Sequence, residues 1–163
     1  MLVENVYLAE GAKIIGNVQI GEDSSVWYNA VVRGDSNPIV IGKNTNVQDN
    51  AVLHTSKSHA LSIGDNVTIG HGAIVHGCTI GNNVLIGMGA IVLDGAVIED
   101  NCIIGAGALV TQNKRMEEGS LIFGNPAKVV RTVTEEEKQS ILENAKEYVL
   151  EAKEYLREKK DEE

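Results

Sequence analysis

The chain has 163 residues, the size of one domain, and a formal net charge of −9. Because nucleic acids and membrane surfaces are themselves anionic, this charge argues against either as a partner. The opening MLVENVYL has no basic stretch and no long apolar run, so we expect neither a signal peptide nor a membrane span, and a cytoplasmic protein. Cys78 and Cys102 are too few and too far apart for a disulfide framework.

An aliphatic residue recurs every six positions through residues 1–115. These anchors are Leu2, Leu8, Ile14, Ile20, Val26 and Val32, then Ile41, Val47 and Leu53, then Ile63, Ile69 and Val75, and, after one skipped residue, Ile80, Ile86, Val92, Ile98, Ile104 and Val110. Small or β-branched residues recur four places after the anchors, as at Ala30, Ala51, Ala73, Thr79 and Ala90. A period of six fits short strands joined by tight corners, where Gly, Asn and Asp tolerate positive φ. With three units to a triangular coil, the anchors predict an all-β solenoid, a parallel β-helix of about six coils.

The end of the chain has a different pattern. After a connector over residues 116–133, we expect an amphipathic helix within residues 134–160, all in the same domain as the solenoid. Thr134 and Glu137 have the spacing of a capping box. Apolar residues then follow at three- and four-residue spacing, Leu142, Ala145, Val149, Ala152 and Leu156, flanked by Ile141, Tyr148 and Tyr155. Because a helix with one apolar stripe must bury it, this helix should pack on the solenoid or on a neighbouring subunit.

The interruptions of the repeat predict where a site lies. Val32, Leu53 and Val75 fall on one face of the solenoid, here face A, in successive coils. The residues that follow them, Arg33, His54 and His76, should therefore form one column, with coils about 4.8 Å apart. Two imidazoles one coil apart can converge on a metal ion at about 2.0–2.1 Å each. The insertions after Val32 and Leu53 and the skipped residue after Val75 all adjoin this column, as expected where function competes with regularity.

His71 lies outside the column, because it comes two places after the anchor Ile69 on another face. A neighbour related by threefold symmetry could bring it to His54 and His76, which predicts a cyclic homotrimer with metal sites at its interfaces. Gln48 follows the anchor one coil earlier on the same face as His71, so we expect it near that interface.

Several of these residues together resemble a known family. The runs Arg33-Gly34-Asp35 and Asn46-x-Gln48-Asp49, with His54, His71 and His76, are similar to the pattern of gamma-class carbonic anhydrases. The lattice itself resembles the left-handed β-helix of hexapeptide-repeat proteins, and the resemblance supplies the left hand.

The resemblance implies that His54 and His76 of one subunit and His71 of the next hold the metal. It also implies that Gln48, with Asn46 nearby, lies beside the metal-bound water and that Arg33 and Asp35 pair at the interface. The substrates would be CO2 and bicarbonate, with a metal-bound hydroxide as the nucleophile. One divalent transition metal per chain is expected, zinc first, with iron or cobalt as alternatives, since imidazole suits all three.

The sequence also departs from the family pattern. Other members carry a glutamate after the Arg-Gly-Asp run and another in the loop after the first histidine, whereas this chain has Ser36 and the run Thr55-Ser56-Lys57-Ser58. Proton export is therefore expected to be slow, or to pass through His59, and the activity could be weak. Two other functions stay open: a hexapeptide acyltransferase acting on a coenzyme A thioester, and a non-catalytic metal-binding homologue.

Overall fold

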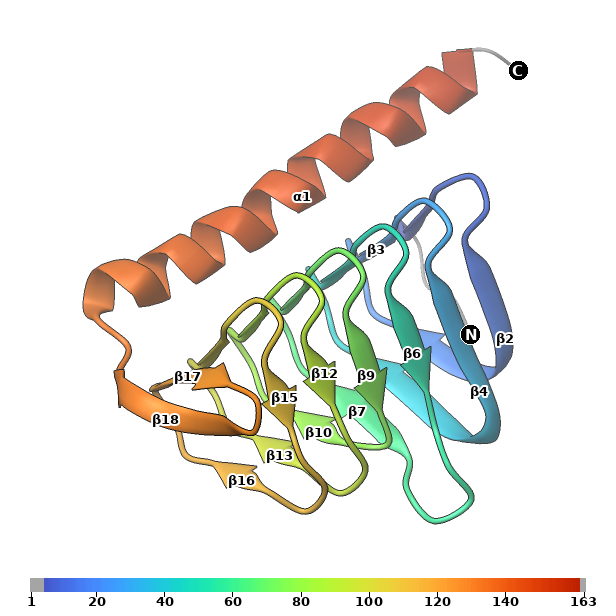
Figure 1. Cartoon of the computed structure of the whole chain (residues 1–163). Coiled ribbons are helices and arrows are strands. Elements are labelled where there is room, and N and C mark those ends of the chain that lie inside the picture. Colours follow the sequence, from blue (N-terminus) through green and yellow to red (C-terminus); the bar gives the residue numbers. More distant parts are fainter. Residues whose placement is uncertain (1–4, 162–163) are drawn as a thin grey trace.

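The computed structural model describes residues 5–161, with the side chains of residues 159–161 left out, and it is a parallel β-solenoid with one long helix beside it (Figure 1). The solenoid has about six coils, which confirms the predicted fold. The first predicted anchor, Leu2, lies outside the described residues.

One face, here face C, is an 8-stranded sheet. Its strands, in order across the sheet, are β1 (Tyr7–Leu8), β3 (Ser25–Val26), β5 (Asn46–Val47), β8 (Thr68–Ile69), β11 (Leu85–Ile86), β14 (Ile103–Ile104), β17 (Ser120–Gly124) and β18 (Ala127–Thr132). All neighbours pair in parallel except β17 and β18, which pair antiparallel and close one end of the sheet.

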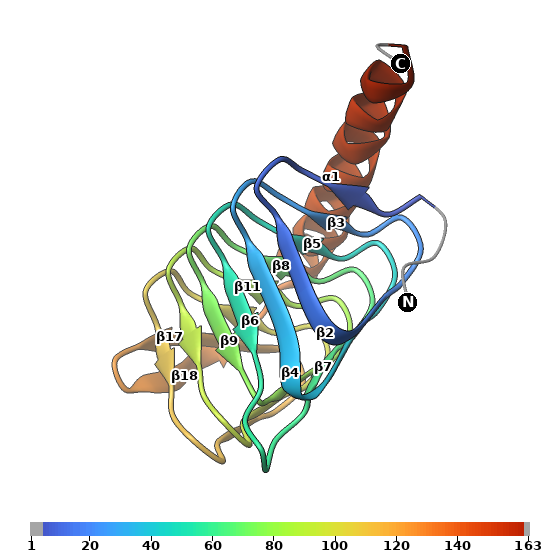
Figure 2. The ribbon, with the colours of Figure 1, turned by 90° about the vertical axis from the view of Figure 1, so that its right-hand side faces the viewer.

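The other two faces share a 10-stranded sheet, because the long strands β2 (Lys13–Ile20) and β4 (Val31–Ile41) continue from one face to the next (Figure 2). Face A continues from β4 with β6 (Val52–His54), β9 (Ile74–His76), β12 (Ile91–Val92) and β15 (Leu109–Val110). Face B continues with β7 (Leu61–Ile63), β10 (Thr79–Ile80), β13 (Val97–Ile98) and β16 (Arg115–Met116).

The anchors fill the interior, as the period of six predicted. Val32, Leu53 and Val75 have no exposed surface, and Ala30 and Ala51 at the second inward position are equally buried. Small side chains are required there because each coil leaves little space between its three walls.

The skipped residue after Val75 shifts the second inward position by one residue. Cys78, not Thr79, points inward after Val75: Cys78 is buried and Thr79 is exposed. The second inward residue keeps its place two positions before the next anchor, Ile80, so the skipped residue shortens the corner that contains Gly77, whose φ is +52°. Cys102 is also buried, and both thiols are free.

The corner between faces B and C is stabilised by stacked asparagines. Asn44, Asn66, Asn83 and Asn101 have φ between +52° and +59°, a region that asparagine tolerates better than most residues. Each amide donates to the next along the solenoid, from Asn44 to Asn66 at 3.1 Å, Asn66 to Asn83 at 3.1 Å, and Asn83 to Asn101 at 3.3 Å. We call this row the asparagine ladder. Its last amide, Asn101, donates to Glu118 Oε1 at 3.0 Å, so the row of hydrogen bonds runs on within the chain.

The parallel solenoid continues beyond residue 115, into the segment predicted as a connector. Strand β17 pairs in parallel with β14, and the buried residues Met116 and Ile122 extend the six-residue spacing from Val110. The methionine interrupts the aliphatic series, so the pattern in the sequence ends earlier than the structure does.

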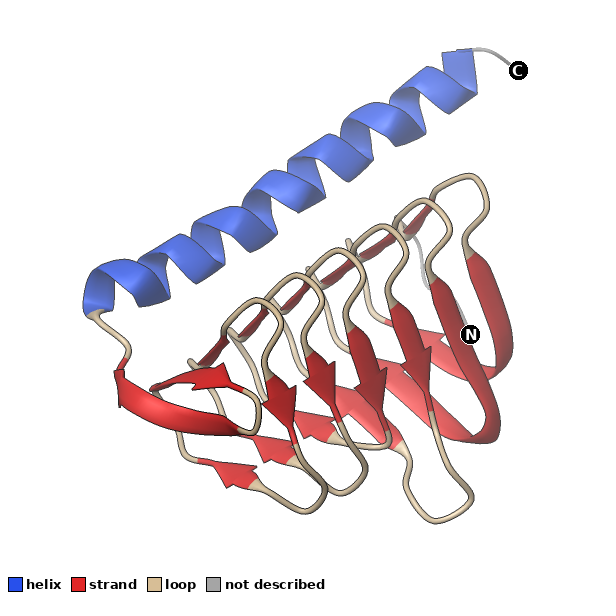
Figure 3. Cartoon of the chain, viewed as in Figure 1, coloured by secondary structure: helices blue, strands red, loops and turns tan. Residues whose placement is uncertain are grey.

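Helix α1 (Glu135–Asp161) lies along face C, as Figure 3 shows. The capping box is confirmed: the Glu137 carboxylate accepts from the Thr134 N–H at 2.9 Å, and the Thr134 hydroxyl accepts from the Glu137 N–H at 3.1 Å. Ala145 and Ala152 of the predicted stripe are buried, but the centre of the buried side is rotated toward the predicted flank, since Ile141 is buried and Leu142 is 37% exposed. No helix among the described residues is long and apolar enough to cross a membrane.

Aromatic side chains explain the rotation of the helix. Tyr148 and Tyr155 contact the Trp27 ring edge-on, with ring centroids 5.4 and 5.6 Å apart, and Tyr7 packs on the same indole at 5.1 Å. These large rings set which side of the helix faces the solenoid, because they bury more apolar surface than the leucines. The helix therefore packs on its own chain.

Candidate metal centre

Arg33, His54 and His76 form the predicted column. The register pairs Arg33 with His54 and His54 with His76 on the adjacent strands β4, β6 and β9. The two imidazoles approach each other edge to face, and His54 Nδ1 lies 3.1 Å from His76 Nε2. The parallel pairing alone is sufficient to bring them together, because β-strands one coil apart align their side chains.

The other nitrogen of each imidazole ring lies within hydrogen-bond distance of an aspartate carboxylate. His54 Nε2 lies 2.9 Å from Asp35 Oδ1, and His76 Nδ1 lies 2.5 Å from Asp94 Oδ1. A carboxylate accepts hydrogen bonds, so each far nitrogen is the N–H donor, and the facing nitrogens of the neutral rings present lone pairs. Two lone pairs 3.1 Å apart attract only when a proton or a metal cation lies between them.

The donor set fits a metal ion. Two ligands at about 2.0–2.1 Å from one tetrahedral ion lie about 3.3–3.4 Å from each other, close to the spacing of the facing nitrogens. Imidazoles that bind metals also characteristically donate their second N–H to a carboxylate, as both rings do here. His54 and His76 therefore have the chemistry and spacing of two ligands to one ion.

His71 lies on a different corner, between faces C and A, and its side chain is 44% exposed. Its Nδ1 is 2.9 Å from Asp49 Oδ2, so it too has an aspartate on one nitrogen. In the part of the chain that the structure describes, no three His, Cys, Asp or Glu residues converge on a common metal position. A site with all three histidines therefore requires a second copy of the chain.

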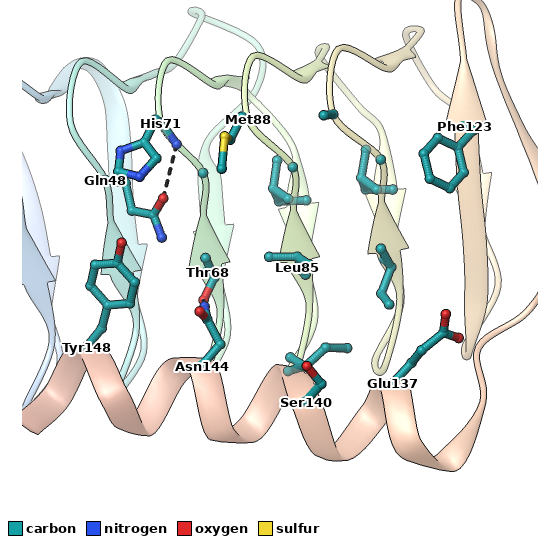
Figure 4. A pocket seen from close by; sticks show the side chains of 18 residues that line it. Gln48, Thr68, His71, Leu85, Met88, Phe123, Glu137, Ser140, Asn144 and Tyr148 are labelled. Carbon is teal, nitrogen blue, oxygen red and sulfur yellow. Dashed lines mark hydrogen bonds between the residues drawn. The ribbon is translucent and has the colours of Figure 1, made fainter.

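Gln48 is next to His71, as Figure 4 shows. Its Oε1 accepts from the His71 backbone N–H at 3.2 Å, and its Nε2 donates to Asn46 Oδ1 at 3.1 Å. Asn46 is buried and donates to the Thr68 hydroxyl at 2.9 Å, so it anchors Gln48 and does not itself reach a histidine.

Arg33 and Asp35 form the predicted pair, with Arg33 Nη1 2.5 Å from Asp35 Oδ2. Hydrogen bonds from Arg33 and then His54 lower the pKa of Asp35 to about 2. Asp35 thus remains a carboxylate at neutral pH and connects Arg33 to His54.

Asp94 is the residue that the sequence reasoning missed. It lies on the corner after β12, one coil beyond His76. Partial burial acts to raise the pKa of Asp94, but hydrogen bonds from His76 and Ser56 outweigh it and the pKa lies below its ordinary value. His59 Nδ1 is 3.6 Å from the other carboxylate oxygen, too long for a hydrogen bond. Extending the histidine column by one coil would have drawn attention to this carboxylate.

A groove of about 590 Å³ separates α1 from face C and opens beside Gln48 and His71 (Figure 4). Apolar side chains form most of its lining, with the exposed Met88 and Phe123 among them. His71 is therefore at one end of an apolar surface.

Comparisons with known proteins identify the family of the chain. Residues 60–91 and 77–112 match the family model "Bacterial transferase hexapeptide (six repeats)". A Methanocaldococcus jannaschii protein named "Probable carbonic anhydrase" is 58% identical over 91% of this chain and 94% of its own length. The mitochondrial gamma carbonic anhydrase 2 of Arabidopsis thaliana is 45% identical over 90% of this chain, which spans only 55% of that relative.

Among solved structures, a Bacillus cereus protein described provisionally as an acetyltransferase superposes with a TM-score of 0.93 at 43% identity, covering 94% of this chain and 90% of its own. The hexapeptide fold makes the solenoid a left-handed β-helix. Identity this high, over almost the full length of a relative of similar size, shows the family. The chain belongs to the gamma carbonic anhydrase-like family of hexapeptide-repeat proteins.

Proposed function

We propose that this protein catalyses the reversible hydration of CO2 to bicarbonate and a proton. One divalent transition metal per chain, zinc first, is held by His54 and His76 of one subunit and His71 of the next. The observation that carries the proposal is the distance of 3.1 Å between one nitrogen of His54 and one nitrogen of His76. The other nitrogen of each ring is hydrogen-bonded to an aspartate. When bound, such an ion would act as a Lewis acid that lowers the pKa of water to about 7.

The roles of the protein groups follow from their contacts. Asp35 and Asp94 fix the orientation of His54 and His76. Asn46 holds Gln48 against the His71 backbone, so in the assembled site the Gln48 amide is positioned to orient water or CO2. Arg33, paired with Asp35, keeps that carboxylate charged and directed at His54.

A trimer fits the exposed surfaces beside the histidines. Val52 and Ile74, two positions before His54 and His76, are 37% and 39% exposed on face A. On the corner that carries His71, Met88 is 62% exposed. Burying these apolar side chains against one another between subunits would favour the association that brings the histidines together.

The loop after His54 offers no carboxylate to accept the proton, and its polar groups are Thr55, Ser56, Lys57, Ser58 and His59. Serine and threonine hydroxyls do not take up an additional proton near neutral pH, and a lysine ammonium has no lone pair to accept one, so His59 is the one group of this loop that can receive it. We therefore expect turnover that depends strongly on the concentration of added buffer.

The test is elemental analysis of the purified protein, followed by a stopped-flow CO2 hydration assay after incubation with zinc or iron. We expect about one metal per chain and buffer-dependent hydration, and neither in His54→Ala. If the protein held metal but did not hydrate CO2 in any buffer, it would be a non-catalytic metal-binding homologue. Absence of metal combined with saturable binding of acetyl-coenzyme A would favour an acyltransferase and overturn the proposal.

A further inference from the structure

Asp94 contacts a predicted metal ligand, yet no part of the motif that resembles the gamma class includes it. It lies on the corner between β12 and β13, and its side chain is mostly buried, with 18% exposed. Its Oδ1 is 2.5 Å from His76 Nδ1, and Ser56 donates to the same carboxylate. The His59 ring lies on its other side, with 3.6 Å between His59 Nδ1 and Asp94 Oδ2.

Other corner aspartates of the solenoid have a different partner. Asp65 Oδ1 accepts the backbone N–H of Lys43 at 2.7 Å, and Asp100 Oδ1 accepts the backbone N–H of Asn82 at 2.7 Å. Both therefore join consecutive coils through the main chain. Asp94 instead meets the ring of His76 in the preceding coil, so its contact serves the orientation of a side chain.

Metal binding depends on which nitrogen of the imidazole ring carries the proton. A neutral imidazole carries one N–H, and only the bare nitrogen can bind a cation. A carboxylate can only accept, so Asp94 selects the form of His76 with the proton on Nδ1 and leaves Nε2 bare toward His54. A carboxamide would not select, because its NH2 group can donate to Nδ1 and stabilise the opposite tautomer.

We propose that Asp94 is a positioning residue of the metal centre, which holds His76 in the Nδ1–H tautomer with Nε2 directed at the ion. This inference rests on the proposed function, because it assigns His76 as a ligand. It extends the arrangement seen at Asp35 and His54 to the second histidine of the chain.

Asp94→Asn tests this role, with Asp100→Asn as the matched control. Both changes remove one negative charge from a solenoid corner and keep an oxygen acceptor. The affinity for zinc is measured by competition with a chelator. We expect about a 10–100-fold loss for Asp94→Asn, the usual effect of removing the partner of a metal-binding histidine, and a change below about threefold for Asp100→Asn.

The tautomer is measured separately by ¹⁵N NMR of the His76 ring in the metal-free protein. We expect Nδ1–H in the wild type and a mixture of tautomers in Asp94→Asn. Wild-type zinc affinity and an unchanged tautomer in Asp94→Asn would overturn the inference, as would an equal loss of affinity in both variants. If the wild type itself bound no zinc, the proposed function would fail, and that outcome is distinct from the failure of the inference alone.

Discussion

Two corners of the solenoid stack polar side chains at the same coil spacing, but they do so with opposite chemistry. On the corner between faces B and C, the Asn66 and Asn83 amides each accept a hydrogen bond from the asparagine before and donate one to the asparagine after. On the corner between faces A and B, His54 and His76 each place one ring nitrogen beside Asp35 or Asp94 and direct the other toward each other. When the carboxylates accept the N–H groups of neutral rings, the two facing nitrogens are bare.

The difference separates a structural stack from a binding site. A ladder that satisfies itself contributes to stability and leaves nothing for a ligand. A stack that is left with two facing acceptors contributes less to stability and requires a cation to complete it. A column of polar residues in a repeat protein is thus interpreted by counting donors and acceptors, not by the presence of the column alone.

The largest expected effect is on metal content when the histidine corner is changed. His76→Ala should reduce bound zinc or iron from about one per chain to background, because one of its ligands is lost. The free energy of unfolding of the metal-free protein should fall by about 1–3 kcal/mol, because the hydrogen bond to Asp94 is lost, whereas the contact with His54 joins two acceptors. Elemental analysis and urea unfolding with a chelator present measure the two quantities. Retained metal in His76→Ala would remove the contrast between the corners.

Changing the asparagine ladder should have the opposite result. Asn66→Ala removes two amide hydrogen bonds and places alanine at φ +55°, which together should cost about 2 kcal/mol in unfolding free energy. Asn66→Gly removes the same bonds without the strain and should cost about 1 kcal/mol less than alanine. Metal content should not change in either variant. A loss of metal in Asn66→Gly would show that the two corners are coupled.

The cap of α1 belongs to neither corner and provides a reference for stability changes. Thr134→Ala removes the hydroxyl that accepts the Glu137 N–H and should cost about 1 kcal/mol. Urea unfolding measures the loss, and Thr132→Ala, on the exposed strand β18, is the control. If Thr132→Ala were equally destabilising, the loss could not be assigned to the cap.

Lowering the pH should have a smaller effect, a loss of stability at the histidine corner and not at the asparagine ladder. The folded state lowers the pKa of Asp35 from its ordinary 3.8 to about 2, so the carboxylate favours the folded state above pH 3.8. That contribution is lost as the pH falls through about 2, while the amide ladder has no group that titrates there. A ¹³C NMR titration of the Asp35 carboxyl measures the midpoint, which should be higher in Arg33→Met. An ordinary midpoint in the wild type would exclude the pairing with Arg33 and His54.

The sequence predicted the fold well because the period of six is imposed by geometry. Anchors such as Val32, Leu53 and Val75 must repeat wherever coils are of equal length, and their register then places His54 beside His76. The same logic put His71 on another corner.

The remaining features depend on packing, which periodicity does not contain. Cys78 replaces Thr79 in the interior because a shortened corner changes which residue faces inward. Ile141 is buried instead of Leu142 because the tyrosines rotate the helix around Trp27. Asp94 was missed because its role comes from a contact between side chains in different coils, and an aspartate at a corner is ordinary in this lattice.

The most direct test of the account mixes two defective chains. His71→Ala keeps His54 and His76, and His54→Ala keeps His71, so neither variant alone should bind metal. If subunits share the site, refolding the two together should restore about one intact site in each mixed trimer, because one interface then joins a His54–His76 pair to an intact His71. Elemental analysis after co-refolding measures the recovered metal. Recovery of metal only in the mixture is the predicted result. Metal in His71→Ala alone, or none in a mixture shown to contain both chains in one trimer, would contradict the shared site.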